Sequence, residues 1–146
     1  MPEVVNTAVI RAPAARIFEY ITNAERNSEW VPDLQLSERV TPGETRIGTR
    51  FRFVSKLAGI PVDVTDEVVQ LVPDRFIAFR GATGPAHSGS WRFEPLEDPS
   101  QTRVTYRMDF ELPPGIGLMA KLIRLEDRLD VQSRACLVNL RDILER

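Results

Sequence analysis

The sequence predicts an α+β fold in which one long C-terminal helix covers a curved, seven-stranded antiparallel sheet. Three observations carry this prediction. Six segments between residues 34 and 112 alternate apolar and polar residues with a period of two, and residues 115–146 show helical periodicity. The breaks between the six segments are short, whereas a parallel crossover needs about a dozen residues or more. Neighbouring strands are therefore expected to pair as antiparallel hairpins.

The composition fits one globular domain spanning residues 1–146. Of these residues 42% are hydrophobic and 27% are charged, with a formal net charge of −2, so electrostatics give no reason to expect nucleic acid as a partner. Neither a signal peptide nor an apolar run of about 20 residues is visible, and a cytoplasmic location without an integral membrane segment is expected. The single Cys136 excludes an internal disulfide and is expected to be a small buried hydrophobe rather than a nucleophile.

The chain is expected to begin with a strand over residues 3–12, followed by two short helices. Pro13 suits the first position of a helix, and an apolar face with helical spacing follows it. Thr22 with Glu25 three residues later matches a capping box. A second short helix is therefore predicted to start at Thr22 and to end near Trp30.

Six further strands are predicted at residues 34–41, 48–58, 61–72, 76–83, 87–96 and 102–112. The last is the clearest, because its apolar residues occupy every second position and place one face in the core. The same alternation puts Phe53 and Trp91 on the inner face. The second half of segment 61–72 is apolar on both faces, which either a β-bulge or a cover formed by the two short helices explains.

The final stretch has no proline after Pro114 and no glycine after Gly117, and it is predicted to form one amphipathic helix. At 1.5 Å per residue, a helix of roughly 30 residues is about 45 Å long. Glu126 and Ser133 fall within its apolar arc, which suits a cavity wall where a ligand or water satisfies them. The alternative is that Glu126 lies at the edge of the arc and reaches water.

Several stretches together resemble a known superfamily: residues 10–21, 29–32, 48–51, 93–95 and 102–105, followed by the long helix. Over essentially the whole chain they are similar to the polyketide cyclase/dehydrase and lipid-transport superfamily (START-like, Bet v 1-like, SRPBCC). The resemblance implies the helix-grip fold, with a deep, largely apolar cavity between the sheet and the last helix. Its members bind lipids, quinones, plant hormones or polyketides, and only some of them transform their ligands. No catalytic residues are shared across the family, so the resemblance transfers none.

The candidate ligand-binding residues are side chains predicted to face this cavity: Glu126, Ser133, Met119, Tyr106, Trp91, Phe53, Asp66 and His87. His87 is in phase with Trp91, and it is either a histidine at the rim or a general base. Asp66 is in phase with Val68 and faces the cavity unless a bulge turns it to solvent. No metal or cofactor is expected, because the sequence has one histidine, no cysteine pair and no glycine-rich phosphate loop.

Three function classes follow from this pattern. The first is a protein that binds a hydrophobic small molecule such as a lipid, an isoprenoid or a polyketide-like compound. The second is a cyclase or dehydratase in which Glu126, Asp66 or His87 transfers a proton, and the third is an interaction module with an incidental cavity. The apolar turn at residues 57–61 and the segment 113–117 are predicted to flank the cavity mouth. The oligomeric state is left open.

Overall fold

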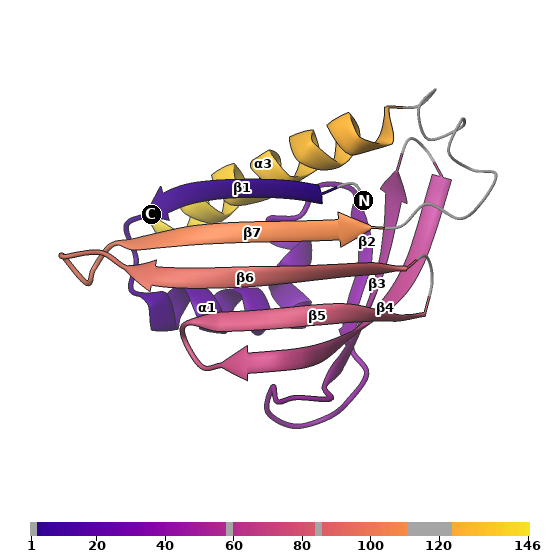
Figure 1. The fold of residues 1–146 in the computed structure, drawn as a ribbon, viewed down its shortest axis with the longest axis horizontal. Coiled ribbons are helices and arrows are strands. Elements are labelled where there is room, and N and C mark those ends of the chain that lie inside the picture. Colours follow the sequence, from indigo (N-terminus) through magenta and orange to yellow (C-terminus); the bar gives the residue numbers. More distant parts are fainter. Residues whose placement is uncertain (1–2, 58–59, 84–85, 111–123) are drawn as a thin grey trace.

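The computed structural model describes residues 3–57, 60–83, 86–110 and 124–146 (Figure 1). Strand β1 (Glu3–Ile10) leads into helix α1 (Ala14–Thr22) and the 3₁₀-helix η1 (Ala24–Glu29). Six strands and a final helix follow: β2 (Leu34–Arg39), β3 (Arg50–Leu57), β4 (Ile60–Val72), β5 (Phe76–Thr83), β6 (His87–Pro95), β7 (Thr102–Phe110) and α3 (Leu125–Leu144).

The strands form one antiparallel sheet in the order β1-β7-β6-β5-β4-β3-β2. From β2 to β7, strands that are neighbours in the sequence therefore pair as hairpins. Strand β7 also pairs with β1, so β1 and β2 lie at the two edges of the sheet. Helices α1 and α3 lie on the same face of the curved sheet, which is called the inner face below (Figure 1). This arrangement confirms the predicted α+β class and the seven-stranded curved sheet.

The inner face of β7 carries the core that the sequence predicted. Thr102, Val104 and Phe110 are buried, whereas Arg103 and Arg107 on the opposite face are exposed. The core joins this face to the buried side of α3, which presents Cys136, Leu137, Leu140 and Leu144. The face that alternation defines on the strand thus packs against the face that the 3.6-residue period defines on the helix.

Strand β4 contains the irregularity that its sequence indicated. Val68 pairs with Phe79 and Gln70 pairs with Ala78, so Val69 is an extra residue on β4. Beyond this bulge Leu71 pairs with Ile77, which is fully buried on the inner face. A bulge, rather than a cover formed by the short helices, therefore explains why both faces of this stretch are apolar.

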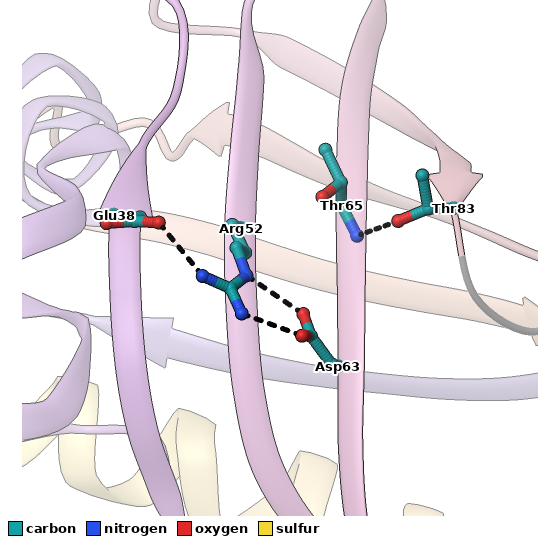
Figure 2. Close-up of polar contacts among 5 residues, drawn as sticks. All are labelled: Glu38, Arg52, Asp63, Thr65 and Thr83. Atoms are coloured by element: carbon teal, nitrogen blue, oxygen red, sulfur yellow. Dashed lines mark hydrogen bonds and ion pairs between the residues drawn. The ribbon is translucent and has the colours of Figure 1, made fainter.

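On the outer face of strands β2, β3 and β4, charged side chains form a network exposed to solvent. Figure 2 shows Arg52 between Asp63, at 2.8 and 3.0 Å, and Glu38, at 3.4 Å. The bidentate contact with Arg52 lowers the pKa of Asp63. All three side chains are at least 40% exposed, so the network favours the register of these strands and adds little stability.

Two predictions about the helices are wrong. The capping box at Thr22 does not form, because Asn23 precedes η1 without a side-chain cap and the Thr22 hydroxyl donates to the Phe18 carbonyl oxygen instead. Helix α3 begins at Leu125, after Arg124 with a left-handed φ of 54°, so one helix does not run continuously through Arg124. Met119, segment 113–117 and the centre of the turn at residues 57–61 lie outside the described residues.

Candidate functional site

The inner face is lined by an aromatic cluster that joins η1 to the middle of the sheet. Trp91 of β6 and Tyr106 of β7 are cross-strand partners, and their rings stack with centroids 4.2 Å apart. The Trp30 ring, at the end of η1, meets Trp91 edge to face at 5.6 Å. On β3, Phe53 lies parallel to the buried Phe51 at 6.3 Å. Trp91, Tyr106 and Phe53 therefore lie on the face where the sequence placed them.

Asp66 and His87 form a hydrogen-bonded pair on the same face. Asp66 is the cross-strand partner of the buried Phe51, and His87 is the cross-strand partner of the buried Phe110. His87 Nε2 contacts Asp66 Oδ1, and the two side chains keep 19% and 17% of their surface exposed. The prediction that Asp66 faces inward is correct. The extra residue of β4, Val69, follows Asp66, and at the irregularity just before Asp66 the extra residue, Ala82, belongs to β5. Nothing in the pattern of residues indicated that these two side chains meet.

Gly81 of β5 makes this contact possible, because Asp66 and His87 lie on strands that are not adjacent. Asp66 pairs with Gly81, and the His87 imidazole lies against the Gly81 backbone. A Cβ atom at position 81 would lie 2.6 Å from His87 Cε1 and 2.7 Å from His87 Nδ1. A side chain there would displace the ring.

We expect Gly81→Ala to destabilise the protein by about 1–3 kcal/mol, because the added methyl group overpacks against His87. In a His87→Ala background the same change should cost nothing or stabilise the strand, since alanine fits a strand better than glycine. Urea unfolding of the four proteins in this double-mutant cycle measures the difference. Equal effects in the two backgrounds would show that the imidazole does not lie over Gly81.

Burial also shapes the chemistry of two groups that lie between the sheet and α3. Burial raises the pKa of the Tyr106 hydroxyl, and the nearby Cys136 and Asp66 act in the same direction. Burial raises the pKa of the Cys136 thiol from 9.0 to about 12. Cys136 is 5% exposed and belongs to the core, so the prediction of a small buried hydrophobe is confirmed.

Native Cys136 should therefore react with a disulfide reagent at about pH 8 far more slowly than the same protein in denaturant, because the thiolate is the nucleophile. The raised pKa of Cys136 also makes the stability of the protein depend on pH. Below the unfolded value of 9.0 both states hold the thiol proton, and stability falls as pH rises from there towards about 12. Ellman's reagent with and without urea measures the first effect. Equal reaction rates would place the thiol at the surface.

Ser133 and Glu126, the two polar residues predicted to lie within the apolar arc of the last helix, differ in burial. Ser133 is buried, and Asn6 Nδ2 of β1 donates to its Oγ at 3.1 Å and to Asp130 Oδ1 at 3.0 Å. Arg134 donates from Nε to Asn6 Oδ1 at 3.3 Å, and its Nη2 forms an ion pair with Asp130 Oδ2 at 3.0 Å. This network joins β1 to α3 and explains the buried serine. Glu126 is exposed in the first turn of α3, so the expectation that its side chain faces inward is wrong; the alternative at the edge of the arc is correct.

Sequence reasoning did not select Trp30. Its side chain is 5% exposed, and its indole Nε1 has no hydrogen-bond partner among the described residues. The Trp30 carbonyl oxygen accepts a hydrogen bond from Asn139 of α3 at 3.2 Å, so Trp30 joins η1 to the last helix. The available signal was a tryptophan two residues before Pro32. Periodicity, however, does not predict whether the side chain of a residue between two elements faces the core or solvent.

Within residues 3–57, 60–83, 86–110 and 124–146, no group of three or more His, Cys, Asp or Glu side chains is placed to hold a metal ion. No helix in these ranges is long and apolar enough to cross a membrane. A cytoplasmic location stays a prediction.

The curved sheet, the helices packed on its inner face and the aromatic cluster between them define the class of START-like, helix-grip proteins. More specifically, the chain belongs to the family described as polyketide cyclase / dehydrase and lipid transport, whose model matches residues 1–145. The resemblance inferred from the sequence is thereby confirmed.

Solved structures share the fold over nearly the whole chain. The Zhui aromatase/cyclase from Streptomyces sp. R1128 is 25% identical, with a TM-score of 0.82 over 99% of this chain and 93% of that one. TTHA0849 from Thermus thermophilus is also 25% identical, with a TM-score of 0.77 over 97% and 95%. A START superfamily protein from Mycobacterium smegmatis, at 18% identity and a TM-score of 0.77 over 98% and 97%, shares the fold.

A curated relative is an uncharacterised protein of Mycobacterium tuberculosis (strain ATCC 25618 / H37Rv). It is 29% identical over 108 residues, which are 73% of this chain and 47% of the relative. The chain thus spans about half the length of the curated relatives it matches.

Proposed function

We propose that the protein binds a hydrophobic small molecule with a few polar atoms, such as a lipid, an isoprenoid or a polyketide-like compound. The ligand lies between the inner face of the sheet and α3, against Trp91, Tyr106 and Phe53. Membership of the family and the likeness to the aromatase/cyclase and START-like structures support this function.

The Asp66–His87 pair on the inner face is the observation that carries the proposal. A core needs no such pair, because apolar residues of similar volume stabilise a protein at least as well. The pair lies among buried aromatic residues and keeps about a fifth of its surface exposed. A polar pair that is accessible on an otherwise apolar, aromatic face favours contact with the polar atoms of a ligand.

Native mass spectrometry of the protein purified from its own source tests this function. We expect a fraction of the molecules to carry an additional mass that gentle activation removes, because an apolar ligand stays bound during purification. Denaturation of the same preparation is the control, since a non-covalent ligand is lost and a covalent adduct is not. The mass of the bare chain alone, together with no binding of added hydrophobic probes, would contradict the proposal.

A second candidate function is proton transfer of the cyclase or dehydratase type, and the Asp66–His87 geometry favours it specifically. A carboxylate that holds one nitrogen of an imidazole fixes the tautomer and stabilises the imidazolium formed when the ring takes a proton. The structural likeness to an aromatase/cyclase supports the same candidate.

The two candidates differ in the ligand that a His87→Gln protein retains. For a dehydratase, protein produced in the same source should accumulate an unreacted ligand heavier by one water than the ligand of the unchanged protein. For a carrier, both proteins should yield the same ligand. Mass spectrometry of solvent extracts distinguishes these outcomes, and Arg107→Gln on the outer face of β7 is the matched control.

A further inference from the structure

We propose that the indole N–H of Trp30 is the hydrogen-bond donor that holds a neutral carbonyl or ether oxygen of the ligand. This inference rests on the proposed binding function and adds the chemical class of the ligand. Trp30 is 5% exposed, packs edge to face on Trp91, and has no partner for Nε1 among the described residues. An indole has one donor and no acceptor, so the described residues use none of its hydrogen-bonding capacity.

Trp30 differs in this respect from the other buried atoms that have no partner in the described part of the chain, Asn27 Oδ1 and Arg39 Nη1. The Asn27 amide donates to Ser37 Oγ at 3.3 Å, and the Arg39 guanidinium donates to Thr45 Oγ1 at 2.7 Å. One unused atom in a group with several hydrogen-bonding atoms is common. A buried donor that makes no hydrogen bond is rare, because its desolvation is not compensated.

The surroundings of Trp30 set the chemistry of the oxygen. Its described ring contact is Trp91, which stacks on Tyr106, so the indole adjoins apolar aromatic surface. An anionic oxygen brought against these rings would lose its hydration, and the ring contacts described for Trp30 supply no positive charge to offset a cost that far exceeds one neutral hydrogen bond. A ketone, ester, quinone or ether oxygen avoids that cost. The expected ligand is therefore an oxygenated apolar molecule rather than a free carboxylate.

Three probes of nearly the same shape test the inference: 2-acetonaphthalene, 2-isopropenylnaphthalene and 2-naphthoate. The protein should bind the ketone about 3- to 10-fold more tightly than the hydrocarbon, as expected for one additional neutral hydrogen bond, and bind the carboxylate most weakly. In Trp30→Phe, which keeps an aromatic ring and loses the N–H, this preference should vanish. Arg107→Gln, on the outer face of β7, should retain it. Because the probes match in shape, a change in packing cancels from the ratio.

Nuclear magnetic resonance supplies a readout that does not need the Trp30 variant to fold. The chain has two tryptophans, so the ¹⁵N-labelled protein has two indole N–H signals, and a spectrum of Trp91→Phe without ligand identifies the one from Trp30. That signal should move downfield with the ketone and stay in place with the hydrocarbon. Binding of both neutral probes with equal affinity and no shift would overturn the inference and leave the proposed function intact. Failure of all three probes to bind would overturn both, and preferential binding of the carboxylate would overturn the ligand class.

Discussion

Val104→Asp is expected to abolish cooperative folding. Val104 is fully buried on the inner face of β7 and belongs to the core that includes Leu140 of α3. A carboxylate at this position loses its hydration without a partner, which costs several kcal/mol. A typical domain has only about 5–15 kcal/mol of stability in total. Thermal unfolding followed by circular dichroism should therefore show no cooperative transition, or one shifted far downward.

Arg107→Asp places the same side chain on the exposed face of the same strand. It removes the exposed ion pair with Glu3, whose atoms are 3.3 Å apart, so the expected cost is at most about 1 kcal/mol. A similar loss of folding in the two variants would show that the register of β7 is wrong.

Leu140→Ala is expected to destabilise the protein by about 2–5 kcal/mol, because Leu140 is fully buried and truncation leaves a cavity between α3 and the sheet. Urea unfolding measures this cost. Val138→Ala, on the other side of the same helix, is the matched control. Val138 is 45% exposed, so its truncation should change stability by no more than about 0.5 kcal/mol. Equal costs would mean that α3 does not pack through the face that carries Leu140.

The fold was predictable because periodicity and loop length are local properties of the sequence. The strict alternation in β7 requires one buried and one exposed face, and the hairpins require antiparallel pairing. The bulge at Val69 was predictable only as one of two alternatives, since an extra residue and a covered outer face leave the same apolar pattern. The start of α3 was missed because Arg124 is a residue that helices tolerate, and its positive φ leaves no trace in composition.

The site was less predictable, because it depends on contacts between distant parts of the chain. Alternation assigned Asp66 and His87 to the inner face, but their contact depends on the absence of a side chain at Gly81 on the intervening strand. A helical wheel placed Glu126 and Ser133 together. It did not contain Asn6, the residue of β1 that engages Ser133. Trp30 lies between elements, where no period applies.

The central claim is that an oxygenated hydrophobic ligand lies between the inner face of the sheet and α3. A crystal structure of the protein purified from its own source tests this claim most directly. We predict non-protein electron density against Trp91 and Tyr106, with an oxygen atom at hydrogen-bonding distance from Trp30 Nε1. An interior filled entirely by side chains, with the Trp30 indole bonded to another group of the protein, would contradict it.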